Sequence, residues 1–161
     1  MLTKEHFSIL AQKYIDTVFR VAFSWLKSRP EADDVTQTVF LKLCQTDKPF
    51  ESDEHVKHWL IRVAINECKK QLISPWRKQE SIEDYANTLS FTASEHSELF
   101  YAVMDLPKKY RMPLFLYYYE DYSTQEIADI LPIPRATVAT HLKRGRDMLR
   151  TILQEAKDDV Y

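Results

Sequence analysis

Glycine is nearly absent from this chain of 161 residues, because Gly145 is the only one. Hairpin sheets and phosphate-cradling loops need residues that adopt positive φ at little cost, and glycine does so most readily. The glycine-rich loops of Rossmann and P-loop nucleotide sites are therefore excluded. We expect an all-α chain that forms one ordinary domain or two small ones.

Cysteine is also scarce, and Cys44 and Cys68 have no Cys or His partner at metal-ligand spacing. We therefore expect no disulfide framework, no metal site and no cofactor, and we predict that both cysteines are small buried apolar side chains. Apolar runs such as residues 114–119 are too short to cross a bilayer. Residues 1–12 lack an apolar core with a cleavage site, so we expect a cytoplasmic protein.

The overall charge is balanced, with 22 Lys and Arg against 24 Asp and Glu and a formal net charge of -2. This balance excludes a uniformly basic coat of the histone type, although local basic patches remain allowed. The 45% apolar content excludes wholesale disorder.

Apolar residues spaced three and four apart predict amphipathic helices over residues 3–27, 30–45 and 53–73. Pro30 suits the start of the second helix, where Asp33 and Asp34 also favour the positive end of the helix dipole. The loop before the third helix carries one aromatic residue, Phe50. The second helix is predicted to bury Ala32, Val35, Val39 and Leu43 and to expose Asp34, Gln37, Thr38 and Leu41.

The charge changes sign near the middle of the chain. Residues 56–78 carry six basic residues and one acid, whereas residues 80–105 carry six acids and no Lys or Arg. Residues 79–92 lack a helical period and are rich in Ser, Asn and Thr, which is typical of a linker. We therefore predict a first domain over 1–75, an acidic linker over 76–93 and a second domain over 94–161.

The second domain is predicted to begin with a helix that buries Leu99, Val103 and Leu106, and Pro107 opens the next helix. Pro113 lies where that helix should be continuous, so the helix either starts there or is kinked. The tyrosines at 117–119 are predicted to pack in the core, with one ring pointing outward.

Residues 123–150 have the layout of a helix-turn-helix. Ser123 and Glu126 match a capping box, and Pro132 and Pro134 separate this short helix from a long one over 135–155. A helical projection of the long helix predicts that Val138, Leu142, Gly145 and Leu149 are buried and that Ala136, Thr140, Lys143, Arg144 and Asp147 lie opposite.

The long helix is strongly basic. Between residues 135 and 150 it has five basic residues against the single acid Asp147, a local excess of 5 − 1 = 4 positive charges. Such a helix fits the major groove and supplies donors to phosphates and base edges. A helical hairpin with a solvated basic face remains the alternative. The five basic residues are Arg135, Lys143, Arg144, Arg146 and Arg150.

The order of these features resembles the extracytoplasmic-function sigma factors, the smallest class of bacterial RNA polymerase sigma subunits. Residues 33–43 look like the acidic helix that docks on the polymerase, and residues 59–66 look like the promoter-melting segment. The similarity of the second domain rests on Leu106, Pro107, Arg111, Ser123, residues 126–128 and residues 137–146. The resemblance covers nearly the whole chain. It implies two small helical domains, a region 2-like bundle and a region 4-like helix-turn-helix, joined by a flexible acidic linker.

The resemblance also implies roles for individual residues. The polymerase-binding set, which would contact the clamp helices of the large β′ subunit, is Asp34, Gln37, Phe40 and Leu41. The set for the minus-ten promoter element is Phe50 and Asn66, on a flipped base, with Arg62, Lys69 and Lys70 on the backbone. The set for the minus-thirty-five element is Thr140, Lys143 and Arg144, on bases or nearby phosphates, with Arg135 and Arg146 on phosphate.

Some of these residues have a structural alternative. Trp59 is predicted to belong to the core rather than to stack on a base. Phe50 could either stack on a base or cap the core, and Asn66 could be a solvated helix residue. Thr38 stands where many relatives of this family have an acid, so docking is expected to depend more on Asp34. Asp121 replaces a frequent glycine and tolerates the left-handed conformation.

The resulting prediction is a promoter-specificity subunit that is not an enzyme. Its expected partners are core RNA polymerase, promoter DNA and an anti-sigma factor, and it is not expected to insert into a membrane. The alternatives are a freestanding helix-turn-helix regulator, a helical adaptor, and an enzyme whose site is assembled only in space.

Overall fold

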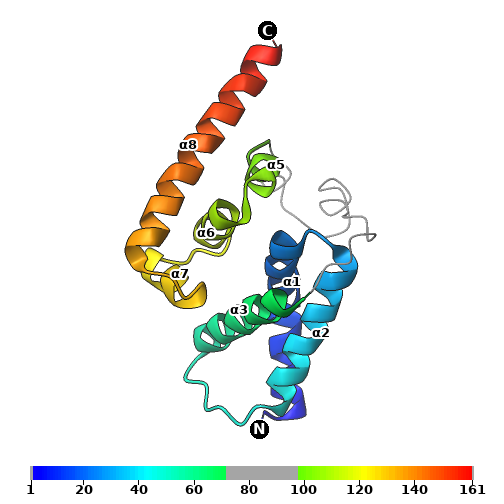
Figure 1. The fold of residues 1–161 in the computed structure, drawn as a ribbon. Coiled ribbons are helices and arrows are strands. Elements are labelled where there is room, and N and C mark those ends of the chain that lie inside the picture. Colours follow the sequence, from blue (N-terminus) through cyan, green and yellow to red (C-terminus); the bar gives the residue numbers. More distant parts are fainter. Residues whose placement is uncertain (1, 72–97, 161) are drawn as a thin grey trace. The chain divides into compact units, whose positions relative to one another are not determined.

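The computed structural model describes residues 2–71 and 98–160 (Figure 1). Within these ranges the chain forms seven α-helices and no strand, which confirms the all-α prediction. The contacts divide the chain into two compact units, Met1–Glu80 and Ser81–Tyr161. The predicted linker over 76–93 and its two boundaries lie outside the described residues.

The first unit is a bundle of α1 (Lys4–Leu26), α2 (Arg29–Gln45) and α3 (Asp53–Lys70), in which each helix packs against the other two. Polar side chains fix where these helices begin. Thr3 Oγ1 accepts a hydrogen bond from His6 N at 3.1 Å, and Ser52 Oγ accepts one from His55 N at 3.1 Å. Side chains of this type satisfy backbone donors that the first turn of a helix leaves free.

The predicted inward residues of α2 lie in the core of this unit. All four are fully buried: Ala32, Val35, Val39 and Leu43. The third helix is shorter than the sequence suggested, because α3 ends at Lys70 with Gln71 as its C-cap. Between α1 and α2, Lys27 adopts the left-handed conformation with φ 53° and Ser28 caps the start of α2. Pro30 therefore lies in the first turn of α2, as expected.

The second unit contains α5 (Glu98–Asp105), α6 (Lys108–Tyr118), α7 (Thr124–Ile130) and α8 (Arg135–Val160). Both α6 and α8 pack against each of the other helices of this unit. The α6 helix begins before Pro113 and continues beyond it, so the structure excludes a helix start at that proline. Arg111 is buried in this unit and donates from Nη1 to the carbonyl of Leu106 at 2.9 Å. Burial lowers the pKa of Arg111 to about 10.

Two predictions about inward-facing side chains are wrong. Leu99 is 45% exposed, because the buried stripe of α5 runs through Phe100, Val103 and Met104 instead. Both Tyr117 and Tyr118 are exposed, whereas one outward ring was expected. The reason is that the buried part of α6 ends at Leu116.

The two cysteines differ. Cys68 is buried, as predicted, but Cys44 is exposed because the inward stripe of α2 ends at Leu43 and the next residue turns away from it. In residues 2–71 and 98–155, no three His, Cys, Asp or Glu side chains are grouped as metal ligands would be. No helix in these ranges combines the length and the apolar character that a membrane span needs.

Candidate nucleic-acid interface

One face of α3 is lined by residues that can contact nucleic acid. Trp59, Arg62 and Asn66 follow one another at spacings of three and four, so they lie on the same side of the helix. They border a cavity of about 290 Å³. The full lining of this cavity is Lys48, His55, His58, Trp59, Arg62, Val63 and Asn66.

The loop before α3 brings Phe50 to the same place. The Phe50 ring packs edge-on against Trp59, with centroids 5.5 Å apart, and against His55, with centroids 5.3 Å apart. His55 Nδ1 in turn accepts a hydrogen bond from the backbone N–H of Glu51 at 3.1 Å. The loop is therefore fixed to the start of α3, and Phe50 is left half-buried.

The lining combines an aromatic surface, cations and an amide. Arg62 and Asn66 are exposed, and Trp59 is half-buried. An aromatic ring can stack on an unpaired base, an arginine can contact phosphate, and an amide can read a base edge. The structure thus brings together three of the predicted minus-ten residues: Phe50, Arg62 and Asn66.

The other two residues of that set lie apart from the cavity lining. Lys69 and Lys70 are exposed at the C-terminal end of α3, and Lys70 forms an ion pair with Glu67. A positive charge there also interacts favourably with the C-terminal end of the helix dipole.

The prediction that Trp59 belongs to the core is wrong. The buried stripe of α3 runs through Leu60, Ile61 and Ala64, and Trp59 lies on its flank. Sequence reasoning also missed Lys48, His55 and His58 as lining residues. The spacing of His55, Trp59, Arg62 and Asn66 was the signal that could have identified this face, since polar and aromatic residues recur there at helical intervals.

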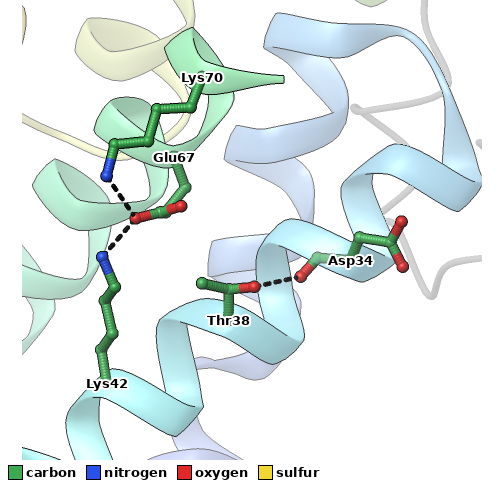
Figure 2. A network of polar contacts seen from close by, with 5 residues as sticks. All are labelled: Asp34, Thr38, Lys42, Glu67 and Lys70. Atoms are coloured by element: carbon green, nitrogen blue, oxygen red, sulfur yellow. Dashed lines mark hydrogen bonds and ion pairs between the residues drawn. The ribbon is translucent and has the colours of Figure 1, made fainter. Parts of the chain in front are cut away.

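The exposed face of α2 carries most of the predicted polymerase-binding set. Asp34, Gln37 and Leu41 are exposed, and Leu41 is a large apolar side chain with 57% of its surface open. Phe40 is only 8% exposed and so belongs mainly to the core of the bundle. Thr38 donates from Oγ1 to the carbonyl of Asp34 at 3.0 Å, as Figure 2 shows. Its hydroxyl is thus engaged with the backbone of its own helix.

A carboxylate joins α2 to α3. Glu67 Oε1 forms ion pairs with Lys42 on α2 and with Lys70 on α3, the latter at 3.3 Å (Figure 2). The Glu67 side chain is only 12% exposed. Hydrogen bonds from Lys42 and Lys70 hold the pKa of Glu67 below its usual range despite this burial. The bridge fixes the helix with the predicted docking face relative to the helix that lines the cavity.

In the second unit, α7 and α8 form the predicted helix-turn-helix. Ser123 Oγ accepts from Glu126 N at 3.1 Å and Glu126 Oε1 accepts from Ser123 N at 3.0 Å, which confirms the capping box. Arg135 Nε donates to Thr124 Oγ1 at 3.3 Å and so links the starts of the two helices. Asp121 precedes this motif with φ 59°, the left-handed conformation that it was expected to tolerate.

The two faces of α8 are divided as predicted. Val138, Leu142, Gly145 and Leu149 are buried, whereas Thr140, Lys143 and Arg144 are exposed. Gly145 allows α6 to approach closely, because a Cβ atom at this position would lie 2.7 Å from Leu114 Cδ1. The close packing of α6 fixes α8 so that its basic face is turned to solvent.

Arg146 differs from the other predicted residues of α8. Its Nη1 donates to the Tyr118 hydroxyl at 3.2 Å, so it is bound to the end of α6. It also borders a largely apolar groove of about 540 Å³. The groove is lined by Leu99, Val103, Tyr118, Tyr119, Arg146, Leu149, Arg150 and Leu153.

The two units match two family models. Residues 10–78 match Sigma-70 region 2, and residues 97–149 match Sigma-70 region 4. The first match contains the α3 cavity, and the second contains the helix-turn-helix.

Curated relatives extend this similarity over most of the chain. The RNA polymerase sigma factor SigV of Bacillus subtilis is 30% identical over 88% of this chain and 86% of its own length. The ECF RNA polymerase sigma factor SigW of the same organism is 25% identical over 94% of this chain and 91% of its own length. The RNA polymerase sigma-H factor of Pseudomonas aeruginosa is 25% identical over 94% of this chain and 88% of its own length.

Solved structures share the fold. The sigma factor RpoE from Bartonella quintana, crystallised with the anti-sigma factor NepR, gives a TM-score of 0.68 at 18% identity over 93% of this chain and 98% of its own. CnrH, in complex with the cytosolic domain of CnrY, gives a TM-score of 0.65 at 20% identity over 95% of this chain and 90% of its own.

Proposed function

Because the chain belongs to the extracytoplasmic-function sigma factors of the sigma-70 family, we propose that it is a promoter-specificity subunit that recognises two promoter elements. In this proposal it binds core RNA polymerase, contacts the minus-ten and minus-thirty-five elements, and has no catalytic activity of its own. Such a subunit works in the cytoplasm, where the polymerase is. The α3 cavity, with its aromatic, cationic and amide lining in the region 2 unit, is the observation that supports this function best.

The cavity on α3 is proposed to hold a base of the minus-ten element. Trp59 and Phe50 offer aromatic surfaces, and Asn66 lies on the same helix face with an exposed amide. A base that leaves the DNA stack loses its stacking energy, and contact with an aromatic ring restores about 1–3 kcal/mol. Arg62 and Lys69 would hold the neighbouring phosphates, and Lys70 would join them if it leaves Glu67.

The exposed face of α2 is proposed to dock on the clamp helices of the β′ subunit. Leu41 supplies exposed apolar area on this face, and Asp34 and Gln37 supply polar contacts along it. The buried Phe40 would support Leu41 from below rather than touch the partner broadly. The Glu67 bridge would then transmit the position of the docked helix to the promoter-melting helix.

The basic face of α8 is proposed to enter the major groove at the minus-thirty-five element. Thr140, Lys143 and Arg144 are exposed on the side opposite the packed residues. Arg135 lies at the start of α8, where it would contact phosphate, and Arg146 would do so only by leaving Tyr118. In this arrangement residues 1–75 and 94–161 act as separate reading domains, joined by an acidic linker over 76–93.

An anti-sigma factor is proposed as a further partner. Both structural neighbours described above were solved as complexes, RpoE with the anti-sigma factor NepR and CnrH with the cytosolic domain of CnrY. Such a partner would block initiation if it covered the exposed face of α2.

Run-off transcription tests the proposal. Purified core polymerase is incubated with a promoter library, with and without this protein, and the start sites are sequenced. The expected result is that the protein selects a distinct set of promoters. Asn66→Ala should impair melting on those promoters, and Arg144→Ala should impair recognition of the upstream element. Lys4→Ala, which changes an exposed residue at the start of α1, is the charge control for Arg144→Ala.

Two results would overturn the proposal. Start-site choice that does not change when the protein is added would remove the sigma function altogether. Tight and specific binding to duplex DNA by the protein alone, with no affinity for polymerase, would favour a freestanding helix-turn-helix regulator. If both variants initiate as the unmodified protein does, the site assignments are wrong while the family stands.

A further inference from the structure

We propose that Lys109 on α6 and His141 on α8, together with Arg144, form a phosphate-binding site that holds the backbone of the promoter duplex beside α8. This inference rests on the proposed function. It extends the DNA-contacting surface from α8 to the start of a second helix, and it adds Lys109 and His141 to the upstream-element residues.

Two of the three side chains, His141 and Lys109, lie against Tyr110. The His141 ring packs edge-on against the Tyr110 ring, with centroids 5.6 Å apart and an interplanar angle of 85°. Lys109 Nζ lies 5.1 Å from the centroid of the same tyrosine ring. Arg144 follows His141 by three residues on α8, so it lies on the same side of that helix, and it is exposed. One phosphate beside Tyr110 would therefore have two cations and an imidazole within reach.

The imidazole is neutral near neutral pH. Burial lowers the pKa of His141, and the positive charges of Lys109 on α6 and Arg144 on its own helix lower it further. Tyr110 is the titratable group in direct ring contact with it. No charged group from the described part of α7 contributes to this shift.

The tautomer of the neutral His141 ring determines which of its two nitrogens can donate a hydrogen bond to a ligand. His141 Nδ1 is buried and has no hydrogen-bond partner among the described residues. A buried donor without an acceptor costs more than a buried acceptor without a donor, so the proton of the neutral ring belongs on Nε2. His141 is only half-buried, which leaves Nε2–H as the group that can donate to a ligand.

The charges around this site, like Lys143 of α8, lack the partners among the described residues that three other basic residues of α8 have. Arg135 is bound to Thr124, Arg146 to Tyr118 and Arg150 to Asp147. In contrast, neither Lys109 nor Arg144 forms an ion pair or a hydrogen bond with any described residue. Lys109 has only its contact with the Tyr110 ring. Two unpaired cations beside a neutral donor form an arrangement that an anion stabilises. The sugar–phosphate backbone supplies such an anion next to a helix in the major groove.

Binding of the full-length chain and its variants to a short duplex tests the site. The duplex carries the upstream element of a promoter selected in the transcription experiment, and affinity is measured by fluorescence anisotropy over a range of salt concentrations. Lys109→Ala should reduce the slope of log affinity against log salt by about one, because one phosphate contact with a cation is lost.

His141 should behave differently, because its contact is neutral. His141→Leu should weaken binding about tenfold, as expected for a lost hydrogen bond to a charged group, while the salt slope stays unchanged. His141→Gln keeps an N–H donor and should restore most of the affinity. A role in packing alone would make the Gln and Leu variants equally weak, and that result would overturn the proposal.

Lys4→Ala, on α1 of the other unit, is the charge control and should leave the salt slope as it is in the unmodified protein. If the salt slope of Lys109→Ala equals that of the unmodified protein, the proposal is also overturned. Failure of the site and failure of the proposed function are distinguishable. A chain that selects no promoter refutes the function, whereas a chain that selects promoters but shows no effect of these substitutions refutes only the site.

Discussion

Phe50 and Trp59 come from a loop and a helix, yet their rings meet edge-on with centroids 5.5 Å apart. The two residues are nine positions apart in sequence, and the contact depends on how the loop returns to the side of α3. It places Phe50 against Trp59, which lines the cavity together with Arg62 and Asn66. Trp59 therefore positions Phe50 as well as lining the cavity itself.

Trp59→Ala should impair promoter melting as strongly as Phe50→Ala. The substitution removes one aromatic surface and also the support of the second, so we expect a loss of about 1–3 kcal/mol in open-complex stability. Permanganate reactivity of unpaired thymines in the reconstituted holoenzyme measures this effect. Phe7→Ala, which truncates a half-buried aromatic residue on α1, is the matched control. Equal melting by the control and the Trp59 variant would contradict a role for the aromatic pair.

The Glu67 bridge predicts a pH-dependent contribution to stability. Because Lys42 and Lys70 lower the pKa of Glu67 in the folded state, its contribution is fully present above the ordinary pKa of a glutamate, about 4.3, and is lost as the pH falls through the lower folded value. At neutral pH Glu67→Gln should reduce the free energy of unfolding by about 1 kcal/mol, and the difference should vanish in acid.

Urea unfolding of both proteins across acid and neutral pH, followed by tryptophan fluorescence, measures the Glu67 effect. Glu51→Gln removes an exposed carboxylate from the loop before α3 and serves as the control. A difference between unmodified protein and Glu67→Gln that stays constant into acid would show that the ion pairs are not its cause.

The helix ends and the strongly periodic helix faces could be predicted from the sequence, because they depend on neighbouring residues. The capping box of Ser123 and Glu126 and the burial of Gly145 on α8 are examples. Each follows from the chemistry or spacing of residues within a few turns of one another.

Side chains at the margin of a buried stripe could not be predicted in the same way. Trp59, Leu99 and Cys44 each lie one step outside the residues that their helix buries. Which side of the stripe is covered depends on the rotation of the helix against its partners, and hydrophobic spacing does not specify it to within one residue. The α3 cavity could not be predicted either, because it needs the path of the loop that carries Lys48 and Phe50.

Gly145→Ala should destabilise the second unit although alanine favours helices. The new methyl group would lie 2.7 Å from Leu114 Cδ1, and Leu114 is fully buried. Overpacking of this kind costs about 1–3 kcal/mol, against a gain of about 1 kcal/mol in helix propensity. We therefore expect a net loss of about 1 kcal/mol in the free energy of unfolding.

Chemical denaturation of the full chain measures the Gly145 effect. Ala139→Gly, on the exposed side of α8, measures the effect of helix propensity alone, because no buried side chain is overlapped there. If the overlap with Leu114 is the cause, combining Gly145→Ala with Leu114→Val should cost less than the sum of the single substitutions. Strict additivity would point to another cause.

The two cysteines should react at very different rates with a thiol reagent. Cys44 is exposed on α2, whereas Cys68 is 1% exposed in the core of the bundle, so its thiol reacts only when the first unit opens. Stopped-flow labelling of the native chain should therefore show one fast thiol, and a second that appears at the rate of unfolding in urea. Cys44→Ser should abolish the fast phase and Cys68→Ser the slow one. Fast labelling of the Cys44→Ser protein without denaturant would mean that the core around Cys68 is open.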